Sequence, residues 1–156
     1  KHILKCCEMN RKILVLSDRR DHCILLEELL KNHEQFNKTL GLYLGGMKPG
    51  LLKENESCDV IIGTYSLAHE GLDIPALDTL LMATPKVDII QSVGRILRET
   101  QGKQNDPLVI DIVDSWGCFM SQFNKRRKYY KETGFFIMND TEVKKVNRVE
   151  SYLFED

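Results

Sequence analysis

The chain has 156 residues, of which 42% are hydrophobic and 29% are charged, and its net charge is −1 at pH 7. These values predict one globular domain and exclude a general affinity for nucleic acid, so any such binding has to come from local patches. The longest apolar runs fall short of the ~20 residues of a membrane span. No signal peptide is visible, and the chain starts with Lys1. We therefore expect an intracellular piece of a longer protein.

Five cysteines and four histidines are present, and no two cysteines have C-x-x-C spacing. Because zinc sites in proteins need ligands at characteristic spacings, we expect no metal site in this chain. An odd number of thiols without such spacing is typical of a reduced, intracellular protein.

Five short apolar segments predict β-strands, at residues 12–17, 40–46, 59–64, 79–85 and 107–115. The first of them, "KILVLS", is a continuous apolar run, as expected of a strand that is buried on both faces. Strands of this kind alternate here with helical segments. That alternation predicts an α/β fold in which right-handed crossovers join parallel strands and helices cover both faces.

Helical periodicity is clearest at residues 18–33, where Cys23, Leu26, Leu29 and Leu30 share one face. Three further segments predict helices, at residues 48–57, 88–99 and 118–134. For residues 142–156 the periodicity does not distinguish a helix from a tail.

The segment 88–99, "DIIQSVGRILRE", combines an apolar face with a narrow polar stripe. On a helix, with Gln91 at zero, Arg95 falls at about 40° and Arg98 at about −20°. The opposite side carries four apolar residues: Ile89, Val93, Ile96 and Leu97. This pattern predicts a helix that presents two arginines to an anion; the alternative is a surface helix with two ordinary solvated arginines.

Small and hydroxyl residues stand where three of the predicted strands end, at residues 17–19, 45–46 and 63–64. In open α/β sheets, ligands bind at the carboxyl ends of the strands, and such residues let the backbone approach a phosphate. The alternative is that these are ordinary turn residues, which have the same composition.

Three segments carry a resemblance to superfamily 2 helicases, and they stand in that family's order. "QSVGRILR" (91–98) resembles motif VI, "IIGTYSLAHEGLDIP" (61–75) resembles motif V, and "KILVLSDRRDHCILLEELL" (12–30) resembles motif IV. The resemblance implies the second RecA-like domain of such a helicase. Residues 1–115 would form its parallel sheet and covering helices, and residues 116–156 a C-terminal helix and tail of the same domain.

The stretch 113–137, "VDSWGCFMSQFNKRRKYYKETGFFI", is similar to helicases of large cytoplasmic DNA viruses. The transcript-release helicase of poxviruses and the helicases of African swine fever virus belong to this type. For a viral protein, the resemblance implies the host cytoplasm or the virion as location and the transcription machinery as a partner.

Two departures refine these expectations. Gln91 and the pair Ile96-Leu97 differ from the H-R-x-G-R-x-G-R pattern of DEAD-box RNA helicases, which favours a DNA translocase, with an RNA helicase or transcript-release factor as the alternative. The chain has neither a G-x-x-x-x-G-K-[ST] loop nor a D-E-x-H box. ATP and Mg²⁺ would therefore be bound mainly by an N-terminal RecA-like domain of the same protein, and this chain alone would be inactive.

The resemblance also assigns roles at a nucleotide cleft. Arg98 would be the arginine finger, Arg95 a contact to the γ-phosphate, and Gln91 the link from phosphate to nucleic acid. Gly71 and Asp73 would lie near the ribose and the domain cleft. For Asp73 the alternative is a carboxylate that stabilises a turn.

Single- or double-stranded DNA, or RNA, would cross the strand ends. The expected phosphate contacts are Ser17, Arg19, Gly46, Lys48 and Thr64. The run 124–131, "NKRRKYYK", is either a nucleic-acid contact or a solvated helix face whose tyrosines pack on the core. Two rival functions remain at this point: a nucleic-acid-binding module without motor activity, and a nucleotide-gated interaction domain.

Overall fold

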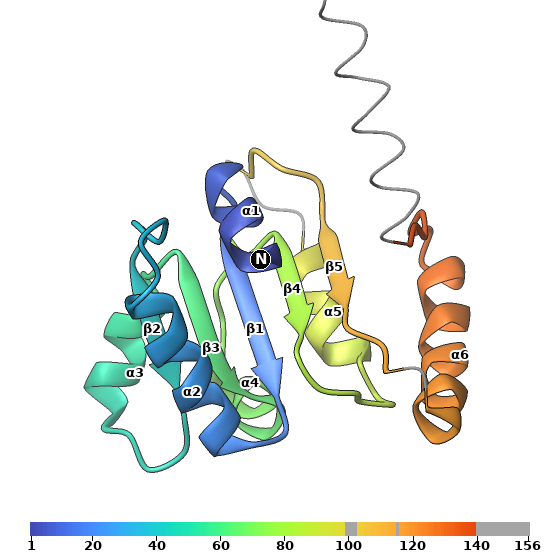
Figure 1. The fold of residues 1–156 in the computed structure, drawn as a ribbon, viewed down its shortest axis with the longest axis horizontal. Helices are drawn as coiled ribbons and strands as arrows, with labels where there is room; N and C mark the ends of the chain where they lie inside the picture. Colours follow the sequence, from blue (N-terminus) through green and yellow to red (C-terminus); the bar gives the residue numbers. More distant parts are fainter. Residues whose placement is uncertain (99–102, 115, 140–156) are drawn as a thin grey trace, which may run out of the picture.

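The computed structural model describes residues 1–98, 103–114 and 116–139. Five parallel strands form one sheet in the order β2-β3-β1-β4-β5 (Figure 1). Their bounds are β1 (Ile13–Ser17), β2 (Leu40–Tyr43), β3 (Val60–Thr64), β4 (Thr79–Met82) and β5 (Leu108–Asp111). All five strands lie within segments that the sequence predicts as strands, so the α/β prediction is confirmed.

Within the described ranges, six helices accompany the sheet: α1 (His2–Glu8), α2 (Arg20–Lys31), α3 (Pro49–Asn55), α4 (Tyr65–Gly71), α5 (Ile90–Leu97) and α6 (Gly117–Glu132). The predictions for α2, α3, α5 and α6 are confirmed. The sequence analysis missed α1 and α4, which have seven residues each, too few for apolar periodicity to show; α3 has the same length and was predicted from its place between two strands. The predicted ambiguity at 142–156 lies outside the described residues.

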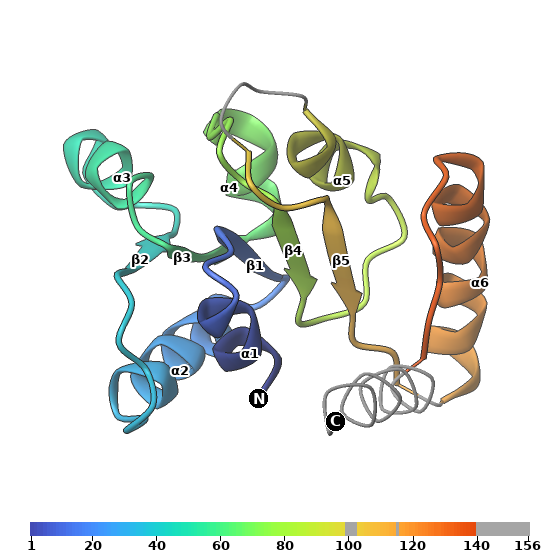
Figure 2. The ribbon, with the colours of Figure 1, turned by 90° about the horizontal axis from the view of Figure 1, so that it is seen from above.

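Helices cover both faces of the sheet, as the fold requires (Figure 2). On one face α1 and α2 pack over a cluster that contains Ile13 and Val15. On the other face α4 and α5 pack over a cluster that contains Leu14 and Leu16. Successive side chains of β1 therefore enter opposite layers, which is why this strand is apolar at each of these four positions.

Two details of the predicted helix faces are wrong. In α2 the residues Cys23 and Leu30 are buried, whereas Leu29 is 59% exposed. Neighbouring parts of the protein therefore cover only part of the apolar face of α2. In the second case α5 ends at Leu97, and Arg98 has the non-helical angles φ −57° and ψ 117°. Arg98 therefore lies directly after the helix and is not a helical member of its polar stripe.

The predicted apolar side of α5 is buried where its side chains are described. Ile89, Val93 and Ile96 are at most 1% exposed, and all three belong to the core beside β4. Gln91 is exposed on the other side. This division confirms that α5 is an amphipathic helix that presents polar groups away from the sheet.

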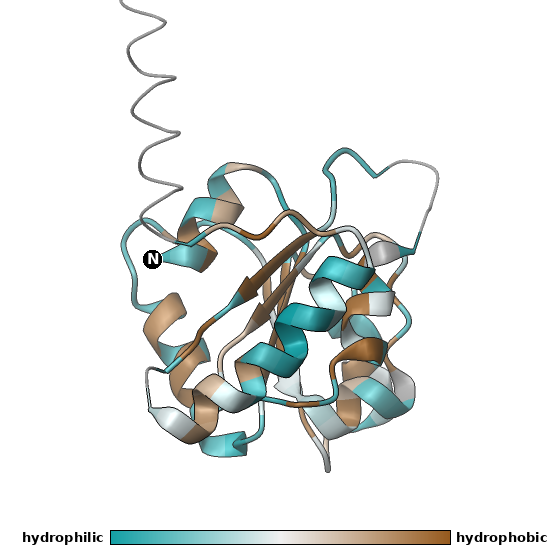
Figure 3. Ribbon diagram, turned by 90° about the vertical axis from the view of Figure 1, so that its right-hand side faces the viewer, coloured by the Kyte–Doolittle hydropathy of each residue, from teal (hydrophilic) through white to brown (hydrophobic). Residues whose placement is uncertain are grey.

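Helix α6 lies beyond β5 at the edge of the sheet (Figure 1) and is mostly hydrophilic where the strands behind it are hydrophobic (Figure 3). Tyr130 is 5% exposed and packs into the core, as the alternative interpretation of the basic run predicts. Arg126 is 1% exposed and pairs with Asp111, so it is not available to nucleic acid. Arg127 and Lys128 remain exposed.

None of the helices in the described ranges is long and apolar enough to cross a membrane. All five cysteines carry free thiols. Burial raises the pKa of the Cys6 thiol to about 11. This buried thiol therefore remains protonated at neutral pH.

Candidate functional site

Arg95 joins the two helices that carry motifs V and VI. Its Nη2 donates a hydrogen bond of 3.1 Å to the carbonyl oxygen of His69, in α4. Its Nε is buried and has no acceptor within the part of the chain that the structure describes. The guanidinium is therefore held by one backbone contact and retains unused hydrogen-bonding capacity.

Arg98 forms an ion pair with Asp73, which follows α4. The two side chains are 52% and 68% exposed, so solvent screens this pair and it contributes at most about 1 kcal/mol. A pair this weak exchanges readily. The guanidinium of Arg98 is therefore able to leave the carboxylate for a more highly charged anion such as a phosphate.

The two arginines are close enough for their charges to interact. Burial lowers the pKa of Arg95, and the charge of Arg98 lowers it further, while Asp73 opposes both effects. Because Arg95 stays charged at physiological pH, the pair forms a local excess of positive charge. An anion placed beside both guanidinium groups would relieve their repulsion.

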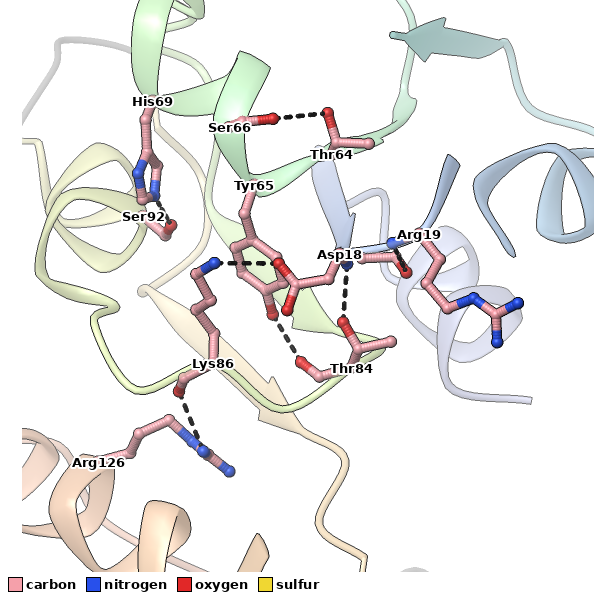
Figure 4. A network of polar contacts seen from close by, with 11 residues as sticks. Asp18, Arg19, Thr64, Tyr65, Ser66, His69, Thr84, Lys86, Ser92 and Arg126 are labelled. Carbon is pink, nitrogen blue, oxygen red and sulfur yellow. Dashed lines mark hydrogen bonds and ion pairs between the residues drawn. The ribbon is translucent and has the colours of Figure 1, made fainter. Parts of the chain in front are cut away.

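His69 and Ser92 connect α4 to α5 through their side chains. The His69 Nε2 lies 3.0 Å from the Ser92 Oγ (Figure 4), and Ser92 is 1% exposed. Burial lowers the pKa of His69, which favours its neutral form. The sequence analysis missed both residues. Ser92 gave a signal, since it is a polar residue beside the buried Val93 on the apolar side of the helix.

The predicted phosphate contacts at the strand ends fall into buried and exposed groups. Ser17 and Thr64 are register partners across β1 and β3, so the ends of these strands lie side by side. Ser17 is fully buried; its Oγ lies 3.0 Å from His22 Nδ1 and accepts a 3.1 Å hydrogen bond from the backbone N of Arg19. Thr64 is half-buried, and Arg19 is exposed.

The segment after β2 completes the same edge. Gly46 is exposed and has φ +81°, a conformation that residues with a Cβ rarely adopt. Lys48 is exposed at the residue before α3. Arg20, at the start of α2, donates a hydrogen bond to the carbonyl of Gly45. This contact joins the first residue of α2 to the loop after β2.

A further polar network joins the ends of β1, β3 and β4 (Figure 4). The backbone N of Asp18 donates 2.9 Å to Thr84 Oγ1, and Tyr65 OH donates 2.8 Å to the Thr84 carbonyl. Lys86 Nζ lies 3.0 Å from Asp18 Oδ1 and 5.4 Å from the centroid of the Tyr65 ring. Arg126 of α6 donates 3.0 Å to the Lys86 carbonyl. These contacts therefore connect the residues that follow β1, β3 and β4 to one another and to α6.

The structure thus places the predicted site residues in two groups. Arg95, Arg98 and Asp73 lie together where α4 and α5 meet. Arg19, Gly46 and Lys48 follow β1 and β2, the two strands that flank β3 in the sheet, and Thr64 is the last residue of β3. Helix α4 connects the groups, because Thr64 directly precedes it and Gly71 is its last residue. Gln91 stands exposed on α5, and no described contact joins it to either group.

The described residues contain no cluster of three or more His, Cys, Asp or Glu side chains that would hold a metal ion.

Three relatives illustrate what the sequence is similar to. A "Putative ATP-dependent RNA helicase" of Acanthamoeba polyphaga mimivirus is 42% identical over 131 residues, which is 83% of this chain and 25% of that protein. Another "Putative ATP-dependent RNA helicase", from African swine fever virus, is 27% identical over 113 residues, or 72% of this chain and 22% of that protein. An uncharacterized protein of Invertebrate iridescent virus 3 is 36% identical over 58% of this chain and 89% of its own length.

The chain therefore spans about a quarter of the helicase relatives it matches. No protein-family model matches it.

Solved structures show the same fold at low sequence identity. The C-terminal part of the Fun30 ATPase domain has a TM-score of 0.63 at 10% identity and covers 80% of this chain and 42% of its own. The C-terminal domain of S. cerevisiae Dbp5 has a TM-score of 0.60 at 17% identity and covers 93% and 87%. The sequence of the chain is therefore similar to putative viral helicases, and its fold is that of a helicase C-terminal RecA-like domain.

Proposed function

We propose that this chain is the second motor domain of an ATP-dependent helicase or translocase. The observation that carries the proposal is the placement of Arg95 and Arg98. One guanidinium is half-buried and bound to the His69 carbonyl, and the other is exposed in an exchangeable pair with Asp73. Two neighbouring cations of this kind suit an anion that arrives from a partner domain.

Phosphoryl transfer from ATP requires cations at the γ-phosphate, where negative charge spreads over three oxygens. Arginine suits this task because it is permanently charged and bridges two oxygens with its planar fork. In our proposal Arg98 is the arginine finger and Arg95 the second γ-phosphate contact. Asp73 and Gly71 lie on the nucleotide side, and Gln91 links this site to nucleic acid.

The phosphate loop and the Mg²⁺ site belong, in this proposal, to an N-terminal RecA-like domain of the same protein. Mg²⁺ would neutralise the developing charge on the β- and γ-phosphates. The residues of this chain fit the complementary role, since Arg95 and Arg98 offer cations to a phosphate. Binding of ATP would close the cleft between the domains, and hydrolysis and release would open it.

The carboxyl ends of the strands provide the second site of this domain, which contacts nucleic acid. We assign nucleic-acid backbone contacts to Arg19, Gly46, Lys48 and Thr64, which line one edge of the sheet. Ser17 acts differently in this assignment: its buried hydroxyl holds the backbone N of Arg19 and so orients that residue. Contacts to the backbone carry no sequence information, which is what a translocating motor requires.

DNA is the substrate that we propose, because motif VI departs from the DEAD-box pattern at Gln91 and at Ile96-Leu97. RNA is the second candidate, and it is favoured by the mimivirus and African swine fever virus relatives, which are named as putative RNA helicases. A role in transcript release, with the transcription machinery as partner, would fit the RNA alternative. A binding module without motor activity is the remaining rival.

The test is ATP turnover by the full-length protein with Mg²⁺, measured without nucleic acid and with single-stranded DNA, double-stranded DNA or single-stranded RNA. We expect turnover that rises on addition of nucleic acid, and more with DNA than with RNA. Stronger stimulation by RNA would replace the DNA proposal with the RNA helicase. Turnover at background under all four conditions would contradict the motor function and favour the binding module without motor activity.

A further inference from the structure

Lys103 contacts the end of the helix that carries motif VI. Its Nζ donates a 2.9 Å hydrogen bond to the carbonyl oxygen of Ile96 and a second one to the carbonyl oxygen of Arg98. Lys103 is half-buried, and neither motif V nor motif VI includes it. One ammonium group therefore binds both the last turn of α5 and the backbone of the proposed arginine finger.

The end of α5 needs such a donor. The last carbonyl groups of any helix lack partners within the helix, and lysine side chains stabilise them. No glycine in the left-handed conformation terminates α5; the chain leaves the helix at Arg98 with φ −57° and ψ 117°. The direction in which Arg98 projects therefore depends on what holds its carbonyl group, and Lys103 does so.

The segment that contains Lys103 contacts residues that lie before β1 and β4, at the amino-terminal ends of these strands. Asn105 Nδ2 donates 3.0 Å to Asp78 Oδ2, and Arg11 Nη1 donates 2.9 Å to the carbonyl of Asp106. Asp78 is 5% exposed and lies 3.8 Å from Arg11 Nη1. These contacts hold the backbone beside Lys103 against Asp78 and Arg11, while its ammonium reaches the end of α5.

We infer that Lys103 is a positioning residue for phosphoryl transfer: it fixes Arg98 at the point where Arg98 leaves α5. The inference rests on the proposed function, because it assumes that Arg98 acts on a phosphate. It adds a residue that touches neither nucleotide nor nucleic acid. Its effect passes through the backbone of Arg98 rather than through the charge of Lys103 at the phosphate.

The experiment uses the full-length protein with Lys103→Met, which keeps an unbranched apolar side chain and removes the ammonium. Misplacing a catalytic group by about 1 Å costs roughly 100-fold, so we expect the kcat for ATP to fall by that order. The affinity for ADP with aluminium fluoride, a mimic of the transferred phosphoryl group, should fall as well. Affinities for ADP alone and for single-stranded DNA should not change, since Arg98 contributes to neither.

Two matched variants accompany it. Lys103→Arg keeps a donor at this position and should recover most of the kcat. Lys31→Met removes an exposed lysine that pairs with Glu27 on α2, and it should behave as wild type. Arg98→Ala serves as the reference for complete loss of the finger.

The outcomes separate the two proposals. If the wild-type protein shows no nucleic-acid-stimulated turnover, the proposed function fails. If the wild type is active and Arg98→Ala is not, but Lys103→Met keeps the wild-type kcat, the positioning role alone is overturned. The positioning role is also overturned if Lys103→Met loses affinity for ADP or DNA together with kcat, or if Lys103→Arg matches the wild type in melting temperature but not in kcat.

Discussion

Arg126 and Asp111 form a bidentate ion pair that joins α6 to the edge strand β5. The Nε of Arg126 lies 2.8 Å from Asp111 Oδ2, and its Nη2 lies 3.0 Å from Oδ1. The arginine side chain is fully buried, and the aspartate side chain is 9% exposed. Tyr130 OH donates a further 3.0 Å hydrogen bond to Oδ2. A helix with a largely hydrophilic surface is thus attached through one buried polar cluster.

We predict that Arg126→Ala lowers the free energy of unfolding by about 3–5 kcal/mol, because Asp111 is left buried without its cation. Urea denaturation of the chain measures this loss. Arg127→Ala, one residue along and exposed, should change stability by about 0.5 kcal/mol or less. The double replacement Arg126→Met with Asp111→Leu should recover much of the loss. Equal, small effects of the two single variants would show that this pair does not hold α6.

We predict that the 156-residue chain alone does not hydrolyse ATP. It contains no phosphate-binding loop and no D-E-x-H box. A steady-state ATPase assay with Mg²⁺ and single-stranded DNA should give background rates, with the full-length protein as positive control. Robust, Mg²⁺-dependent turnover by the chain alone would contradict the proposed division of work between two domains.

Arg98→Ala in the full-length protein should lower the kcat for ATP by about 10³–10⁵, the range found for arginine fingers. The substitution leaves no core cavity, because the side chain is 52% exposed, so stability should change by at most about 0.5 kcal/mol. Arg98→Lys should restore little activity, since an ammonium lacks the forked geometry. A kcat within a few-fold of wild type would identify Arg98 as an ordinary surface charge.

Arg95→Ala should differ from Arg98→Ala in its effect on stability. It removes the hydrogen bond to the His69 carbonyl, and bonds to charged groups contribute about 1.5–3 kcal/mol. We therefore expect both a lower kcat and a lower melting temperature for Arg95→Ala. Unchanged melting would mean that the contact between α4 and α5 does not depend on this arginine.

Binding of nucleic acid by this chain should be weak, independent of sequence and strongly reduced by salt. Arg19→Ala and Lys48→Ala should each weaken binding and reduce the slope of log K against log salt by about one. Titration of labelled strands of differing sequence at several salt concentrations measures both quantities, and Lys31→Ala on α2 is the control. A marked preference for one sequence at constant salt would count against backbone tracking.

His69 should make stability depend on pH. Burial lowers its pKa below the ordinary value of 6.5, so the unfolded chain binds the proton more tightly than the folded chain. The contribution of neutral His69 is therefore fully present above that value and is lost as the pH falls toward its folded pKa. Urea denaturation from about pH 7.5 to about pH 5.5 should show this loss in the wild type.

The matched variants for this effect are His69→Gln and His33→Gln. His69→Gln should show a smaller fall in stability over the same pH range, whereas the exposed His33→Gln should follow the wild type. An identical fall in His69→Gln and wild type would assign the pH dependence to other groups.

The class of the fold follows from the sequence pattern. Its strands are continuous apolar runs because both faces of a parallel sheet are covered, and that pattern is visible without coordinates. The sequence also determined the amphipathic character of α5, since Val93 and Ile96 recur at helical spacing and are buried. The ordered motifs predicted the RecA-like domain, which the fold and the relatives confirm.

Only the packing of the elements shows which polar residues of these segments face solvent and which are buried in hydrogen bonds or ion pairs. Ser17 and Thr64 are far apart in the sequence and become register partners only when β1 and β3 pair. Arg126 follows Lys125 in a basic run, yet it is buried against Asp111, which no local pattern indicates. The contact of Arg98 with Asp73, 25 residues away, arises in the same way. Periodicity reports the burial of a helix face, whereas a specific polar pair depends on how distant elements pack against each other.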